Sequence, residues 1–567
     1  MSSSRFVAPS STPHARATSP AVTLAALTFA YPGAARVLDG LSATFGAGRT
    51  GLVGSNGVGK STLFRLIAGE FRPTSGSLTV HGGGPVGYLP QTLTLRTDAT
   101  VADLLGVRPT LDALAAIERG EIEPELFDTV GDDWDIAERS IARLDAVSSS
   151  LVGADVLDRP VATLSGGETI LVALLGLELA RTPVVLLDEP TNNLDADARA
   201  RLYALVDGWR GALIVASHDV ALLDRMDATA ELRAGSLTVF GGGFSAFCEA
   251  LAVEQDAARQ AVRTAEQRLR AEKRQRIEAQ TKQSRSERQG KARATKGEAR
   301  IAMDWRQNRA EKSQAGNRQL QAAREAEAAS ALADAEARLR ADDRLRLELP
   351  DPGVGSGRRL AELRGTNGAI VLAGPERIGL VGANGVGKTT LLRSLAEGRP
   401  SHLEASAVAF TERIGYLAQR LDGLDDAASA LAQVGAAAPH VPDRELRNRL
   451  ARFGLAGDLT VRPVGALSGG ERFRVALARV LLADPPCQLL VLDEPTNNLD
   501  LSTVDALVDA VASYRGGLLV VSHDQAFLDR LNLDRTLRLT ADAELLDADR
   551  PASEDEGPSP HDPVDPS

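Results

Sequence analysis

The sequence predicts an α/β fold in which two similar halves are joined by a long helical segment. A glycine-rich motif occurs twice, as GSNGVGKS at residues 54–61 and as GANGVGKT at residues 382–389. Five shorter motifs follow each copy in the same order. Between the halves, residues 249–345 contain no proline and only three glycines, a composition that strongly favours helix.

Composition narrows the class of protein. A chain of 567 residues has room for two or more domains, and 43% hydrophobic residues can fill their cores. Two cysteines far apart predict a reducing, cytoplasmic compartment and exclude a disulfide framework. No apolar run approaches the ~20 residues of a membrane span, so we expect no membrane insertion. Residues 1–20 and the acidic, proline-rich residues 541–567 are predicted to be disordered tails.

Both glycine-rich motifs fit the phosphate-binding loop G-x4-G-K-[ST], and each lies between an apolar run and an amphipathic segment. Glycines let several backbone N–H groups point at one polyanion, and the following helix N-terminus adds positive partial charge. We expect the two lysines to reach nucleotide phosphates and the final Ser and Thr to bind Mg²⁺. The predicted nucleotide-binding residues are Gly54, Asn56, Gly57, Gly59, Lys60, Ser61 and Thr62 in the first copy and Gly382, Asn384, Gly385, Gly387, Lys388, Thr389 and Thr390 in the second.

The later motifs supply polar side chains at repeated spacings. Gln91 and Gln419 each lie 31 positions after the loop lysine, and a glutamine amide can touch both a metal shell and an attacking water. Apolar runs end in Asp188–Glu189 and Asp493–Glu494, as expected of buried parallel strands with active groups at their carboxyl ends.

These positions predict the chemistry of each half. Asp188 and Asp493, together with the two glutamines and the loop hydroxyls of Ser61 and Thr389, would hold Mg²⁺. Glu189 and Glu494 would accept a proton from the attacking water. A histidine follows each glutamate after 29 positions, as His218 and His523.

Each half resembles the nucleotide-binding domain of ATP-binding cassette (ABC) proteins, over residues 21–248 and 346–540. The resemblance rests on six motifs in a fixed order: the phosphate loop, the glutamine, LSGGE, LDEP, NLD and SHD. The resemblance implies two P-loop NTPase domains that pair head to tail within one monomer, with two ATP molecules at the seam. Lys60 would then share a site with Ser468, Gly469 and Gly470, and Lys388 with Ser165, Gly166 and Gly167. The histidines would sense the γ-phosphate, and both sites would hydrolyse ATP with Mg²⁺.

Two departures suggest that the sites differ. Tyr31 lies 29 positions before Lys60 and could stack on adenine, although a half-buried strand tyrosine is an equal alternative. The matching count in the second half gives Arg359, whose guanidinium could also stack, against the alternative of an exposed loop arginine. After LSGGE, the second half continues RFRVALAR whereas the first continues TILVALLG, without basic residues.

The block between the halves is charged differently from the rest. Residues 251–345 carry 22 Lys and Arg against 15 Asp and Glu, although the chain as a whole has a net charge of −12. Two apolar stripes at helical spacing predict two antiparallel helices, an α-helical hairpin of the coiled-coil kind. Its expected tip, residues 281–317, has ten basic and four acidic residues. A solvated charged helix is the usual alternative, but we favour contact with nucleic-acid phosphates.

Two cassettes, no membrane span and a charged helical linker are similar to the ABC-F family. The resemblance implies a cytosolic ATPase that binds the ribosome, with the hairpin tip directed at rRNA and the P-site tRNA, and a role in translation regulation or antibiotic resistance. The runner-up is the ATP-binding subunit of a drug-export ABC transporter. The sequence leaves open which of the two roles applies, the drug class, whether both ATP sites are equally active, and the adenine partner in the second domain.

Overall fold

The computed structural model describes residues 20–91, 99–148, 150–192, 194–233, 235–294, 319–320, 322–337, 339, 349–398, 404–418, 423–497 and 499–548. The chain divides into two units, one made of Met1–Phe244 with Asp343–Ser567 and the other of Ser245–Asp342. Most of both predicted tails and much of the hairpin tip lie outside the described residues.

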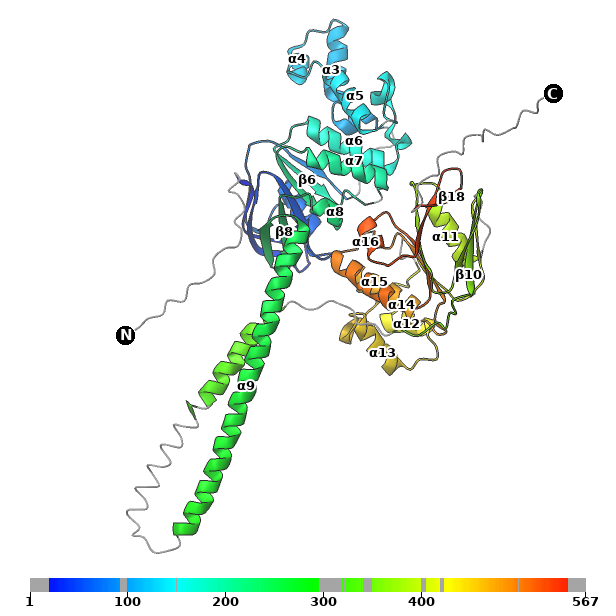
Figure 1. The fold of residues 1–567 in the computed structure, drawn as a ribbon. Helices are drawn as coiled ribbons and strands as arrows, with labels where there is room; N and C mark the ends of the chain where they lie inside the picture. Colours follow the sequence, from blue (N-terminus) through cyan, green and yellow to red (C-terminus); the bar gives the residue numbers. More distant parts are fainter. Residues whose placement is uncertain are drawn as a thin grey trace, which may run out of the picture. The chain divides into compact units, whose positions relative to one another are not determined.

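The first domain contains a three-stranded antiparallel sheet of order β2-β1-β4 and a six-stranded sheet of order β5-β6-β7-β3-β8-β9, which is parallel except for β9 (Figure 1). The strands are β1 Pro20–Ala30, β2 Arg36–Gly46, β3 Arg49–Val53, β4 Ser75–Val80, β5 Val86–Leu89, β6 Val184–Asp188, β7 Ala212–Ala216, β8 Ala228–Arg233 and β9 Ser236–Gly241. The helices are α1 Lys60–Ile67, α2 Val101–Leu105, α3 Arg108–Glu118, α4 Pro124–Val130, α5 Ile136–Val147, α6 Gly166–Leu179, α7 Ala196–Asp207 and α8 Val220–Leu223.

The second domain repeats this plan, with sheets of order β11-β10-β13 and β14-β15-β16-β12-β17-β18. Its strands are β10 Arg359–Gly365, β11 Gly368–Ala373, β12 Arg377–Val381, β13 Ser406–Ala409, β14 Ile414–Leu417, β15 Leu489–Asp493, β16 Gly517–Val521, β17 Arg535–Leu539 and β18 Leu545–Asp547. Its helices are α11 Lys388–Glu397, α12 Ala430–Ala437, α13 Asp443–Arg452, α14 Gly469–Leu481, α15 Leu501–Ser513 and α16 Gln525–Asp529. The duplication that the sequence motifs predict is therefore confirmed in the fold.

Each central strand is buried on both faces, which explains its continuous apolar sequence. In β6, Val184 and Leu186 pack into one core with β1, β2 and α1, and Val185 and Leu187 pack into another with α6 and α7. This alternation follows from the two-residue period of a strand. It leaves Asp188, the last residue of β6, at the carboxyl edge of the sheet.

The unit Ser245–Asp342 contains a long helix, α9 Phe244–Ala294, and a shorter helical stretch at residues 322–336 that runs beside it (Figure 1). Arg268 lies 3.3 Å from Glu327, and Arg276 lies 2.8 Å from Glu325. The later residue of α9 pairs with the earlier residue of the second segment, so the two helical segments are antiparallel. The expected hairpin boundaries were 249–345, and residues 295–318 of the hairpin lie outside the described residues.

The expected tail 541–567 begins too early. Strand β18 lies inside it and pairs antiparallel with β17, between Leu537 and Asp547 and between Leu539 and Leu545. Leu545 is 4% exposed and packs into the core of the second domain. The second sheet therefore continues to Asp547, because a short apolar segment interrupts the acidic sequence. In the described part of the chain, no helix has both the length and the apolar character needed to cross a membrane.

Candidate active site

Each phosphate loop connects the central strand β3 or β12 to the helix that follows it. Gly54 and Gly382 stand at φ 156° and 154°, and a Cβ at either position would lie 2.4 Å from a carbonyl oxygen, of Leu232 or Leu539. Only glycine fits that approach. The loop lysines then begin α1 and α11, so that the helix N-terminus and its N–H groups face the same side as the strand ends.

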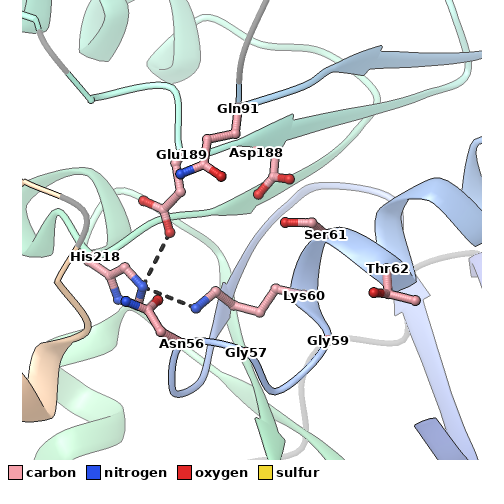
Figure 2. A pocket seen from close by; sticks show the side chains of 10 residues that line it. All are labelled: Asn56, Gly57, Gly59, Lys60, Ser61, Thr62, Gln91, Asp188, Glu189 and His218. Carbon is pink, nitrogen blue, oxygen red and sulfur yellow. Dashed lines mark hydrogen bonds and ion pairs between the residues drawn. The ribbon is translucent and has the colours of Figure 1, made fainter. Parts of the chain in front are cut away.

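The first site is a cavity of about 310 Å³ at the carboxyl edge of the first sheet (Figure 2). It is lined by Asn56, Gly57, Gly59, Lys60, Ser61, Thr62, Gln91, Asp188, Glu189 and His218. Lys60 Nζ lies 2.7 Å from the Gly54 carbonyl and 3.0 Å from His218 Nε2, which in turn lies 3.3 Å from Glu189 Oε1. The structure thus brings together the predicted lysine, hydroxyl, glutamine, carboxylates and histidine of the first half.

The lysine, hydroxyl, carboxylates and histidine of the second half make different contacts. Lys388 Nζ donates to the carbonyls of Gly382 and Ala383, at 2.7 and 2.8 Å. Thr389 Oγ1 donates to Asp493 Oδ1 at 3.0 Å. His523 Nε2 lies 3.4 Å from Glu494 Oε1. Gln419, the predicted counterpart of Gln91, lies outside the described residues.

Both candidate bases have a left-handed backbone conformation, which is uncommon for residues other than glycine. Glu189 has φ 52° and Glu494 has φ 46°. Their N–H groups still continue the parallel sheet, because Glu189 N donates to Ala216 O at 2.8 Å and Glu494 N donates to Val521 O at 2.9 Å. Such strain concentrates at functional sites. Here it recurs at the same place in both domains.

Burial sets the protonation of these groups. It raises the pKa of Glu189 well above its ordinary value and that of Glu494 to about 7, in each case against the opposing effect of the nearby lysine. Burial and the loop lysines lower the pKa of His218 to about 3 and of His523 to about 4. Both imidazoles are therefore neutral near pH 7, and their contacts with the glutamates are not ion pairs.

Two tyrosines that were not among the predicted site residues also contact the sites. Tyr88 OH donates to Asp188 Oδ2 at 3.4 Å, and Tyr416 OH donates to Asp493 Oδ2 at 3.1 Å. Each stands three positions before the predicted glutamine, in YLPQ and YLAQ. Their recurrence at this spacing was the signal that could have identified them.

The LSGGE serines begin helices but do not line the first cavity. Ser165 caps α6 and Ser468 caps α14, and in each case the hydroxyl accepts from a glutamate N–H while the glutamate accepts from the serine N–H. The first glycine of each motif is exposed. Described residues of the first domain alone line the 310 Å³ cavity, so the predicted pairing of Lys60 with Ser468–Gly470 stays a prediction.

The NLD motif of the second domain contacts the phosphate loop of the first. Asp500 caps α15 with Oδ1, and its Oδ2 accepts from the phosphate-loop N–H of Asn56 at 2.9 Å. The negative charge of Asp500 also raises the pKa of Lys60, against the larger lowering that burial causes. The Asp500 carboxylate of the second domain thus accepts a hydrogen bond from a loop N–H group that would otherwise be available to a phosphate.

Tyr31 and Arg359 are not equivalent positions. Tyr31 follows the end of β1, and its hydroxyl lies 3.2 Å from Thr62 Oγ1, whereas Arg359 is the first residue of β10. The count from the lysine was misleading because the β10–β11 hairpin is shorter than the β1–β2 hairpin. The guanidinium of Arg359 lies over Phe410, 4.5 Å from the ring centre, and pairs with Glu362.

The residues present fit a magnesium–nucleoside triphosphate. In each site a hydroxyl and a carboxylate, the oxygen ligands that Mg²⁺ prefers, stand beside a buried lysine at a helix N-terminus. The buried atoms His218 Nδ1, His523 Nε2 and Glu494 Oε1 find no hydrogen-bond partner among the described residues. Unsatisfied buried polar atoms of this kind indicate groups that wait for a ligand or water.

Comparisons with known proteins agree with this geometry. The family model described as ABC transporter matches residues 38–192 and 370–497. Over 525 residues the chain is 34% identical to the tylosin resistance ATP-binding protein TlrC of Streptomyces fradiae. The aligned region covers 85% of this chain and 90% of TlrC. It is 30% identical over 525 residues to the energy-dependent translational throttle protein EttA of Mycobacterium tuberculosis, with 87% of each covered. The probable ATP-binding protein YheS of Escherichia coli is 30% identical over 535 residues, covering 90% of this chain and 78% of YheS.

Proposed function

We propose, from the premise that this chain belongs to the ABC-F family of tandem ATP-binding cassette proteins, that it hydrolyses ATP and couples this cycle to action on the ribosome. The observation that carries the proposal is the convergence of lysine, hydroxyl, carboxylate, glutamate and histidine at the same sheet edge in both domains. The role would be translation regulation or ribosome protection against an antibiotic. The names of EttA and TlrC support one of these each.

In the proposed reaction, Lys60 and Lys388 neutralise phosphate charge, and the backbone N–H groups of the phosphate loops orient it. Ser61 with Asp188 and Thr389 with Asp493 would hold Mg²⁺, joined by Gln91 and Gln419. Bound Mg²⁺ would offset the negative charge that develops on the phosphates.

Glu189 and Glu494 would take the proton from the attacking water. Their raised pKa values suit that task, because a general base works best when its pKa lies near the working pH. The neutral rings of His218 and His523 would each offer one N–H to the transferred phosphate. The helix starts at Ser165–Gly167 and Ser468–Gly470, whose serines and first glycines are exposed, would complete each site from the opposite domain within one monomer.

The hairpin supports a nucleic-acid partner. Lys282 and Arg285 are exposed on α9, and five of the other basic residues of the expected tip lie outside the described residues. An excess of cations in an otherwise acidic chain favours contact with phosphates of rRNA and the P-site tRNA.

Sedimentation with ribosomes tests the proposal. The purified chain should hydrolyse ATP and sediment with ribosomes in the presence of a non-hydrolysable ATP analogue, but less in ADP. Parallel sedimentation with membrane vesicles tests the exporter alternative. A chain that follows the vesicles and ignores ribosomes would exclude the proposed partner. Antibiotic inhibition profiles of strains with and without the gene would then separate protection from translation regulation.

A further inference from the structure

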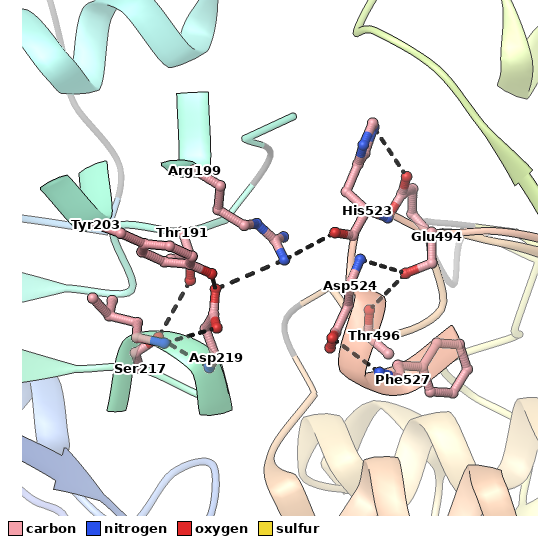
Figure 3. A network of polar contacts seen from close by, with 12 residues as sticks. Thr191, Arg199, Tyr203, Ser217, Asp219, Glu494, Thr496, His523, Asp524 and Phe527 are labelled. Carbon is pink, nitrogen blue, oxygen red and sulfur yellow. Dashed lines mark hydrogen bonds and ion pairs between the residues drawn. The ribbon is translucent and has the colours of Figure 1, made fainter. Parts of the chain in front are cut away.

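Arg199 carries a positive charge from the first domain to the second site. It lies on α7, four residues after the helix cap Asp195, and its side chain is only 13% exposed. Its Nη1 donates to the main-chain carbonyl of His523 at 3.3 Å and lies 3.7 Å from Asp219 Oδ2 (Figure 3). Its Nε is buried and finds no hydrogen-bond partner in the described part of the chain.

The second domain offers no such cation at the matching place. Asp500 caps α15 as Asp195 caps α7, and four residues after it stands Val504, which is 8% exposed. Eight residues after the cap, Tyr203 in the first domain is matched by Val508 in the second. The polar pair of α7 is therefore replaced by two valines on α15, and a valine cannot donate to a carbonyl.

The His523 peptide group connects Arg199 to the candidate base. His523 N donates to Glu494 Oε2 at 3.4 Å, and the carbonyl of the same residue accepts from Arg199. Figure 3 shows this chain of contacts from α7 to Glu494. The positive charge of Arg199 also lowers the pKa values of Glu494 and His523, although burial remains the largest influence on both.

We propose that Arg199 is a positioning residue for the second nucleotide site, where it holds the main chain at His523, and that the first site lacks this support because Val504 stands at the matching place. The inference rests on the proposed ATPase function. It makes the two sites unequal, since hydrolysis at Glu494 depends on a side chain of the other domain. A charge-assisted hydrogen bond is about twice as strong as a neutral one, so its loss should be measurable.

Two full-length backgrounds isolate the sites. Glu189→Gln leaves turnover to the second site, and Glu494→Gln leaves it to the first. We expect Arg199→Ala to lower kcat about tenfold in the Glu189→Gln background with little change in KM, and to change kcat less than about twofold in the Glu494→Gln background. Arg199→Lys should restore part of the loss, because lysine keeps a charged donor. Equal losses in both backgrounds, or none in the first, would overturn the inference.

Controls lie on the same helix. Arg201→Ala removes a charge whose Nη1 donates to Ser148 Oγ at 3.2 Å, and Tyr203→Phe removes the 2.6 Å bond to Asp219 Oδ2 while leaving Arg199 in place. Both should keep the turnover of the Glu189→Gln background. If either variant matches the loss caused by Arg199→Ala, a general weakening of α7 explains the effect and the inference fails.

A second measurement needs no turnover. In the otherwise unchanged chain, Arg199→Ala should speed amide hydrogen exchange in the segment 517–528 around His523, whereas Arg201→Ala should not. Unchanged exchange there would overturn the inference even if a single glutamine substitution silenced both sites. Conversely, a parent chain without ATPase activity would refute the proposed function, and the exchange result would still report on the Arg199 contact.

Discussion

At the residue scale, the carboxylates expected to hold Mg²⁺ are fixed from two sides. The Thr389 hydroxyl donates to one oxygen of Asp493 and the Tyr416 phenol donates to the other. Asp188 receives the corresponding bonds from Ser61 and Tyr88, and the Tyr88 bond is longer, at 3.4 Å. Groups that orient a metal ligand tune the metal almost as strongly as the ligand itself.

We therefore expect Tyr416→Phe to raise the Mg²⁺ concentration for half-maximal ATP hydrolysis by roughly tenfold. The phenylalanine keeps the ring but leaves Asp493 Oδ2 without its 3.1 Å donor. A titration of ATPase rate against free Mg²⁺ measures this. Tyr203→Phe, which removes a phenol bonded to Asp219 rather than to a metal carboxylate, is the matched control. The same Mg²⁺ requirement in Tyr416→Phe and the parent chain would contradict the role.

Motif spacing predicted which side chains gather at the candidate sites but not the backbone conformation of those residues. The pairs Asp188–Glu189 and Asp493–Glu494 were predictable because a buried strand must end where its carboxylates can face a ligand. Their positive φ was not, because nothing in LDEP distinguishes a strained glutamate from an extended one. The count that led to Arg359 did not find a structural counterpart of Tyr31, because counting residues ignores hairpin length.

At the element scale, an aspartate ties each central strand to its neighbour. Asp227 accepts three hydrogen bonds from Arg49 at the start of β3, from the main-chain N at 2.9 Å, from Nε at 3.2 Å and from Nη2 at 2.8 Å. In the second domain, Asp534 accepts from the main-chain N of Arg377 at 2.8 Å. These contacts fix the register of the strand that leads into the phosphate loop.

Asp227→Asn should lower the unfolding temperature of the first domain by roughly 2–4 °C, equivalent to about 1 kcal/mol, because the asparagine loses the charge and one acceptor. The expected change in unfolding temperature is small because the Asp227 side chain is 55% exposed and solvent screens its pair with Arg49. Thermal unfolding followed by circular dichroism measures it. Asp39→Asn, which breaks an exposed pair with Arg36, should change the unfolding temperature little and serves as control.

The effect should depend on pH in a fixed direction. The hydrogen bonds from Arg49 hold the pKa of Asp227 below its ordinary value. Its stabilisation is therefore complete above about pH 4, the ordinary range for aspartate, and is lost as the pH falls through the lowered folded pKa. The difference between parent and Asp227→Asn should be constant from pH 7 to 5 and shrink below about pH 4. A difference that grows in acid would contradict this assignment.

Elements with a strong period were predictable, and the weakly marked ones were not. The continuous apolar runs at β6 and β15 predict strands, and the proline-free sequence of α9 predicts a helix. Strand β18 has only three residues, LLD, in an acidic surrounding, and its place depends on pairing with β17 rather than on its own sequence.

At the scale of the whole molecule, the duplication is complete in fold but not in detail. Both domains carry the same two sheets in the same order. The contacts of the loop lysines differ, and Arg199 of α7 is matched by Val504 of α15. The sequence motifs show the symmetry, whereas the asymmetry depends on side chains outside the motifs.

The charge of the hairpin can be tested in a chain that binds ATP without hydrolysing it. In the double variant Glu189→Gln and Glu494→Gln, both candidate bases are neutral, so ATP should bind, turnover should stop and the chain should sediment with ribosomes in ATP. Undiminished hydrolysis in this variant would refute the assignment of the two glutamates.

Replacing the ten Lys and Arg residues of segment 281–317 with Gln in that variant should weaken sedimentation with ribosomes and flatten its dependence on salt. Each lysine or arginine that meets a phosphate releases a counterion, so removing these contacts reduces the salt slope, by about one unit per contact. Sedimentation across a KCl series measures both quantities. The control exchanges each Arg for Lys and each Lys for Arg at the same positions, which keeps the charge and should keep the slope. If the neutral hairpin binds as tightly as the parent at every salt concentration, the hairpin cations serve only solvation, and the ribosome must be recognised elsewhere.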